Sequence, residues 1–250
     1  MPYAGLVYDV NADWTVYASY TEIFQPQQSY GPNGLLDPVM GKNYEAGVKA
    51  DFYGGRLSAA AAIFRTDRDG LPEVDPNASG CGPTADPTCY KNAEMIRTQG
   101  AEIEVTGAIT DRWNLMASYT YAQVKYEEGP NSGDRYQPNV NPESLAKLAT
   151  TYRMGGALEG LTVGGAMRYQ SSIYYDGTDW ASANLPFRMK QDAYAVVDLM
   201  ARYQFNEKTS VQLNIDNVFD KTYYSSISNP GYGNFIGPER SATLTLNQTF

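Results

Sequence analysis

The sequence contains no histidine and only 2 cysteines, and its 19 Lys and Arg are outnumbered by 28 Asp and Glu. Without histidine, Ser-His-Asp and Cys-His catalysis cannot be built, and most transition-metal sites lose a common ligand. The formal net charge of −9 argues against nucleic acid, whose phosphates require clustered basic side chains. We therefore expect no catalytic residues, no protein-bound metal or cofactor, and no nucleic-acid partner.

Long hydrophobic runs are also missing. No stretch approaches the roughly 18 uncharged apolar residues that a membrane-spanning helix needs, which excludes a helical membrane protein. The first ten residues, MPYAGLVYDV, lack the basic start, apolar core and cleavage site of a secretory signal. We expect either that a signal has been removed or that the chain is not a complete gene product.

The two cysteines, Cys81 and Cys89, lie in a stretch rich in Pro, Gly, Asn and Asp. A short loop closed by a disulfide is typical of exported proteins. Metal or redox chemistry is the less favoured alternative, because the sequence has no CxxC motif and no histidine. We expect a structural disulfide between Cys81 and Cys89.

Aromatic residues are unusually frequent, with 21 Tyr against 8 Phe. Many segments alternate between apolar and polar residues, which is the period of a strand with two different faces. In segments 14–20 and 44–52 the apolar face carries rings at its ends and small or aliphatic residues between them. Eight residues rise about 26 Å along a strand, enough for an apolar band between two aromatic girdles. This pattern favours an outer-membrane barrel over a soluble sandwich, whose rings lie in its core.

The connections between these segments alternate between short turns and long polar loops, as in outer-membrane barrels with their long loops outside the cell. We expect an all-β, transmembrane antiparallel β-barrel portion of about eleven strands, near residues 3–10, 14–24, 43–53, 56–67, 92–108, 112–125, 141–153, 160–174, 190–204, 208–224 and 239–250. Because single-chain bacterial barrels have even strand counts, an odd number predicts that strands are missing before Met1. A passive porin-like channel and a surface β-sandwich binding module remain as alternatives.

Several segments resemble TonB-dependent siderophore receptors, of the ferripyoverdine and ferric coprogen or rhodotorulic acid type. The resemblance is carried in order along the whole chain by YASYTEIFQPQ (17–27), NYEAGVK (43–49), TQGAEIE (98–104), LTVGG (161–165), VDLMARY (197–203), NIDNVFDKTYY (214–224) and GPER (237–240) before a last strand ending at Phe250. It implies that residues 1–250 are the C-terminal part of a twenty-two-stranded barrel in the outer membrane of a Gram-negative bacterium. It also implies that the plug domain and TonB box belong to the missing N-terminal region.

The same resemblance implies a transport function rather than an enzyme: binding of a ferric siderophore outside the cell and its import, energised by TonB. Iron would arrive bound to the siderophore, and lipid would surround the barrel. In related receptors two lumen glutamates pair with plug arginines, and the matching positions are Glu45 and Glu102. They could equally be solvated lumen residues.

Siderophore contacts are expected from rings and a cation on the long loops and upper strands, since rings offer flat apolar contact and Arg offers charge to an anionic chelate. The competing interpretation is that several of these rings belong to the outer girdle or to loop packing. The candidates are Tyr30, Tyr174, Tyr175, Trp180, Arg188, Tyr232 and Phe235.

Overall fold

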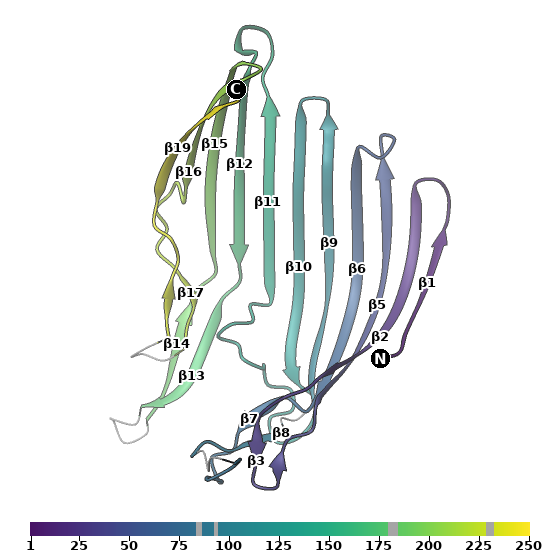
Figure 1. Ribbon diagram of the computed structural model, residues 1–250, viewed down its shortest axis with the longest axis vertical. Helices are drawn as coiled ribbons and strands as arrows, with labels where there is room; N and C mark the ends of the chain where they lie inside the picture. The colour runs from purple at the N-terminus through teal and green to yellow at the C-terminus, as the bar shows by residue number, and fades with distance from the viewer. Residues whose placement is uncertain (84–86, 93–94, 180–184, 229–232) are drawn as a thin grey trace. The chain divides into compact units, whose positions relative to one another are not determined.

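The structure, a computed structural model, describes residues 1–83, 87–92, 95–179, 185–228 and 233–250. Eleven strands form one sheet in the order β1-β2-β5-β6-β9-β10-β11-β12-β15-β16-β19 (Figure 1). Their bounds are Tyr3–Asp9 (β1), Trp14–Gln25 (β2), Val39–Phe52 (β5), Leu57–Asp69 (β6), Ile96–Thr110 (β9), Trp113–Tyr126 (β10), Ser144–Arg153 (β11), Leu161–Gln170 (β12), Tyr194–Asn206 (β15), Thr209–Asp216 (β16) and Ser241–Gln248 (β19). The all-β prediction and its eleven strands are confirmed.

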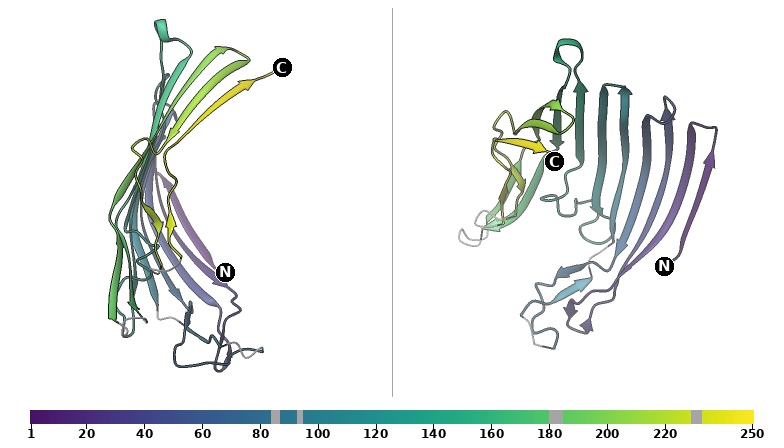
Figure 2. Two further views of the ribbon diagram at one scale, coloured as in Figure 1. Left: turned by 90° about the vertical axis from the view of Figure 1, so that its left-hand side faces the viewer. Right: turned by 45° about the horizontal axis from the view of Figure 1, so that its top comes forward.

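Each long strand lies beside the next long strand along the chain, so the sheet is a meander. The link between β11 and β12 is short and contains a single 3-10 turn, Gly156–Leu158 (Figure 1, Figure 2). Four of the longer connections contain two-stranded ribbons that the sequence pattern did not predict. These are Tyr30–Gly31 with Gly34–Leu35 (β3–β4), Pro72–Val74 with Tyr90–Asn92 (β7–β8), Ile173–Asp179 with Leu185–Gln191 (β13–β14) and Tyr224–Ser226 with Phe235–Ile236 (β17–β18).

The registers of β12, β15 and β16 align residues of one face with residues of the same face on the neighbouring strand. Leu199 lies opposite Gly165 on one side and Ile215 on the other, whereas Met200 pairs with Gly164 and Asn214. The apolar faces are open: Leu6, Ile63 and Leu244 are 79%, 65% and 71% exposed. We call this apolar side the outward face and the polar side the inward face.

Very little of the described chain forms a conventional hydrophobic core. The one cluster of buried residues comprises Tyr194, Val196 and Tyr223. A soluble sandwich would bury its apolar faces between two sheets, so an exposed apolar face of this extent requires a non-aqueous solvent. Within the described residues no helix is long and apolar enough to cross a membrane.

Strand β16 ends at Asp216, although the alternation predicted a strand over 208–224. Asn217 stops it, because its backbone is left-handed with φ of 50°. Its buried side chain donates to the carbonyls of Lys221 and Pro238 at 2.9 and 3.0 Å and accepts from the Lys221 amide at 2.8 Å. Likewise β12 ends at Gln170, and the rest of the predicted segment 160–174 enters the β13–β14 ribbon.

The chain divides into two compact units. The first unit comprises residues 1–48, 62–101 and 122–136, and the second comprises residues 49–61, 102–121 and 137–250.

Candidate functional site

The first inward-facing carboxylate, Glu45, is held in place by a neighbouring strand. The hydroxyl of Tyr17 on β2 donates to Glu45 Oε1 at 2.6 Å. The ring of Tyr17 covers Gly47, where an added Cβ would lie 2.7 Å from it. A glycine under an aromatic ring of the adjacent strand lets the ring lie flat on the sheet. Glu45 is therefore half-buried and fixed, with one oxygen already occupied.

The second inward-facing carboxylate, Glu102, differs from Glu45 in exposure. It lies on β9 in the second unit, and its side chain is exposed. Among the described residues it has neither a hydrogen bond nor an ion pair. Glu104, two residues further on, shares its face by strand alternation. These carboxylates are free to accept a cationic partner from outside the described chain.

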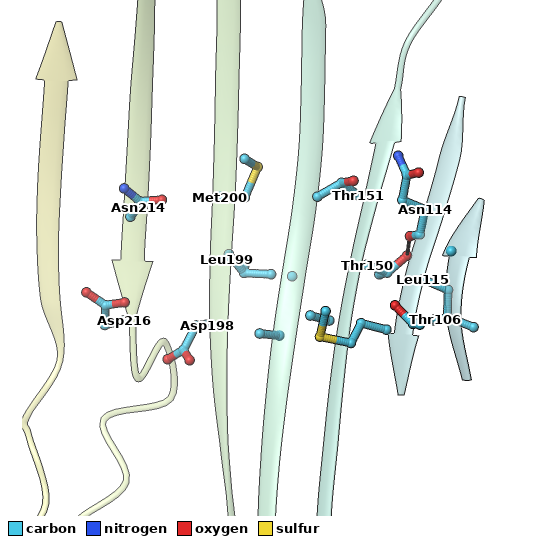
Figure 3. Close-up of a pocket in the computed structure, with 15 residues that line it drawn as sticks. Thr106, Asn114, Leu115, Thr150, Thr151, Asp198, Leu199, Met200, Asn214 and Asp216 are labelled. Atoms are coloured by element: carbon cyan, nitrogen blue, oxygen red, sulfur yellow. Dashed lines mark hydrogen bonds between the residues drawn. The ribbon is translucent and has the colours of Figure 1, made fainter. Parts of the chain in front are cut away.

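The second unit also has a hollow of about 510 Å³, lined mainly by inward-facing residues of β10, β11, β12, β15 and β16 (Figure 3). Its polar residues include Asn114, Asn214, Asp198 and Asp216. Asp198 accepts from the Asn217 amide at 2.8 Å and lies 3.4 Å from Arg168. The sequence pattern did not predict this hollow, because its lining comes from six strands, β9 to β12 with β15 and β16, between Thr106 and Asp216.

The β13–β14 ribbon brings three of the siderophore candidates together. Tyr174 and Tyr175 lie on β13, and Arg188 lies on β14 opposite Asp176. The guanidinium donates to both oxygens of Asp176, at 2.6 and 2.7 Å, and its carbon stands 4.3 Å from the centre of the Tyr174 ring. The hydrogen bonds from Arg188 hold the pKa of the Asp176 carboxyl below its usual range.

This pairing changes what Arg188 offers a ligand. The sequence alone presented Arg188 as a charge for an anionic chelate, but Asp176 neutralises it in the structure. On the other face of the ribbon, the rings of Tyr175 and Phe187 lie 6.0 Å apart beside Gly177. A Cβ at Gly177 would approach both rings to 2.8 Å, so glycine leaves room for this ring pair.

Tyr30, the candidate in the first unit, takes part in loop packing. A Cβ at Gly82 would lie 3.0 Å from the Tyr30 ring, so the ring rests on the loop closed by the Cys81–Cys89 disulfide. Cys89 is completely buried and its carbonyl accepts from the Asp75 amide at 2.8 Å. The disulfide therefore supports the surface on which Tyr30 is presented.

Phe235 is the remaining candidate that the structure describes. Phe235 lies on β18 and is 65% exposed. Trp180 and Tyr232 lie outside the described residues. In the described part of the chain, no group of three or more His, Cys, Asp and Glu is arranged to hold a metal ion.

Comparison with known proteins identifies the barrel type. Residues 1–218 match the family described as "TonB dependent receptor-like, beta-barrel". The chain is 36% identical over 254 residues to the ferric-pyoverdine 358 receptor of Pseudomonas putida, with 100% of this chain and 29% of that protein covered. It is 38% identical over 237 residues to the ferripyoverdine receptor of Pseudomonas aeruginosa, with 91% and 28% covered.

A solved structure agrees with these relatives. The pyoverdine outer membrane receptor of Pseudomonas aeruginosa PAO1, bound to pyoverdine, superimposes with a TM-score of 0.87 at 35% identity. The match covers 100% of this chain and 36% of that one, so the chain spans about a third of its structural relative. The β-sandwich alternative is therefore wrong, and the protein lies in the outer membrane of a Gram-negative bacterium. The chain belongs to the TonB-dependent receptor-like β-barrel family, a family of transporters rather than enzymes.

Proposed function

We propose that residues 1–250 are the C-terminal part of the barrel of a receptor that imports ferric siderophores with energy supplied through TonB. The proposal rests on the match to ferric-pyoverdine receptors along the whole chain, although the chain spans only 29% of the first of them. The two edge strands of the sheet, β1 and β19, are consistent with a larger barrel, because unpaired strand edges are not stable in lipid.

The ligand is proposed to meet rings rather than net charge on the β13–β14 ribbon. Tyr174 and Tyr175 offer flat surfaces, and Arg188 stabilises the ribbon through Asp176 and supports the Tyr174 ring. Phe235 offers a further exposed ring. Tyr30, Trp180 and Tyr232 complete the proposed set of contacts, and iron enters as part of the chelate, without protein ligands.

Glu45 and Glu102 are proposed to face a plug inside the intact barrel. Glu102 is exposed and unpaired within the described chain, so a plug arginine could pair with it fully. Glu45 keeps its bond from Tyr17 and would offer its second oxygen. A carboxylate in a filled lumen needs such a partner to offset its desolvation.

Uptake of radioactive iron tests the function. The full-length receptor should be produced in cells that lack their own siderophore receptors and supplied with iron bound to a pyoverdine. We expect cell-surface binding with or without TonB, and accumulation only with TonB. Accumulation independent of TonB, together with passage of unrelated small solutes, would instead identify a passive channel.

A further inference from the structure

One patch on the outward face of the first unit has a layered composition. Its position follows from the inward face, where Asn43 bonds to Thr66 at 2.7 Å and Tyr17 bonds to Glu45. Alternation turns the flanking residues of β2, β5 and β6 outward. We call this patch the outward patch; it comprises Ala18, Tyr20 and Glu22 on β2, Lys42, Tyr44 and Ala46 on β5, and Ile63, Arg65 and Asp67 on β6.

The lower layer of the outward patch is a hollow. Its lining includes Ala18, Ala46 and Ile63, with Tyr44 and Arg65 above, and its volume is about 370 Å³. Ala18 and Ala46, on neighbouring strands, leave this space open beside Ile63. Ile63 is 65% exposed at the margin. The hollow is therefore apolar and open to the lipid that surrounds the barrel.

The middle layer marks the edge of the apolar band. The rings of Tyr20 and Tyr44 lie 5.1 Å apart, centre to centre. Tyrosine favours this position, because its ring is apolar while its hydroxyl reaches the headgroups. Residues further along the same strands, on the side away from the alanines, lie at the level of the lipid headgroups.

The upper layer has two carboxylates that are already engaged. Asp67 is shared between Arg65, at 2.7 Å, and Arg97, at 2.6 Å, and its side chain is only 15% exposed. Glu22 accepts a hydrogen bond from the Tyr20 hydroxyl. These carboxylates are therefore committed to partners other than Lys42.

The cations of the outward patch keep unused donors. Lys42 is exposed, and within the described residues its ammonium makes no hydrogen bond or ion pair. Arg65 donates from Nε and Nη2 to Asp67, and its Nη1 has no acceptor among the described residues, in a side chain that is 47% exposed. Two available cationic donors therefore lie near Tyr44: Arg65 beside it on β6, and Lys42 two residues before it on β5, on the side away from Ala46.

We propose that the outward patch binds one membrane lipid with a net anionic, phosphate-bearing headgroup, with an acyl chain in the alanine hollow and the phosphate between Lys42 and Arg65. Apolar surface below, tyrosines at the boundary and cations above match the order of groups in such a lipid. Each basic side chain at a membrane surface contributes to the attraction of anionic lipid. This site is separate from the siderophore function, so either proposal can fail without the other.

Native mass spectrometry of the full-length receptor in detergent tests the site. Purified receptor should be titrated with phosphatidylglycerol and, separately, with phosphatidylcholine of the same acyl chains. We expect one phosphatidylglycerol to bind with higher affinity than phosphatidylcholine, and Lys42→Gln to weaken it about fivefold. The matched control is Lys49→Gln, which removes the same charge from the inward face of the same strand and should leave the affinity unchanged.

A second pair of variants tests the hollow. Ala46→Trp fills it and should abolish the preference for phosphatidylglycerol, whereas Ala201→Trp, on the outward face of β15, should not. Retention of the heat-modifiable band on gels verifies that each variant is folded. Equal binding of both lipids to the wild type, equal effects of the two lysine variants, or displacement of the lipid by millimolar inorganic phosphate would each overturn the proposal.

Discussion

Replacing Asn217 should destabilise the receptor more than any other single change in the turn after β16. Its side chain makes three hydrogen bonds, two to the carbonyls of Lys221 and Pro238 and one from the Lys221 amide. Each contributes about 1 kcal/mol, and its loss leaves a buried polar group without its partner. The left-handed backbone, with φ of 50°, costs alanine a further 1–2 kcal/mol or so.

We therefore expect Asn217→Ala to lower the free energy of unfolding by about 4–5 kcal/mol, as three bonds plus backbone strain. Asn217→Gly loses the same bonds without the strain and should lower it by about 3 kcal/mol. The difference in unfolding free energy between the two variants measures the cost of the left-handed backbone for alanine.

Urea unfolding of the full-length receptor in lipid vesicles, followed by tryptophan fluorescence, measures both losses. The control is Asn206→Ala, which removes another turn asparagine whose exposed side chain accepts from the amides of Lys208 and Thr209. Its loss should be smaller, because water replaces both bonds. Equal stability of wild type and Asn217→Ala would refute the reasoning, and equal effects of Ala and Gly would refute the strain term.

Three further predictions concern the loops and the inward face. Arg188→Gln should disorder the ribbon and so weaken siderophore affinity several-fold. Because the pKa of Asp176 is lowered, the ion pair stabilises the folded ribbon fully above the unfolded pKa of about 3.9, and this stabilisation is lost as pH falls through the lower folded pKa. Limited proteolysis at two pH values can follow the loss. Cys81→Ser should expose its loop to proteases while the barrel melts at an unchanged temperature. Gly47→Val should displace the Tyr17 ring and cost about 1–3 kcal/mol in urea unfolding.

Arg188→Gln with unchanged affinity and unchanged cleavage would mean that the ion pair does not order the ribbon. Protection of the loop in Cys81→Ser would show that packing alone holds it. Gly47→Ala is the smaller substitution for comparison. If Gly47→Val keeps the stability of the wild type, the Tyr17 ring moves aside without cost.

The strands were predictable because their signal is local. Alternation in residues 44–52 is visible in the sequence and matches β5, and the eleven long strands follow from the same pattern. The ends of strands were less predictable. Asn217 stops β16 through contacts with Pro238, more than twenty residues away in the sequence.

The pairing of charges was not predictable from the sequence. Arg188 meets Asp176 only because the β13–β14 register places them opposite each other. Tyr17 meets Glu45 because β2 and β5 are neighbours, although 28 residues separate them. Each contact turns a free side chain in the sequence into an occupied one in the fold.

The sequence by itself determined that one face of this sheet is suited to lipid. Alternation with rings at the strand ends specifies an apolar band, because the face on which each residue lies depends only on its odd or even position along the strand. Only the tertiary structure decided which carboxylates and cations remain available: within the described ranges Glu102 and Lys42 are unpaired, while Asp67 and Arg188 are engaged. The physical reason is that cross-strand partners are set by register, which depends on how whole strands and loops pair rather than on any local run of residues.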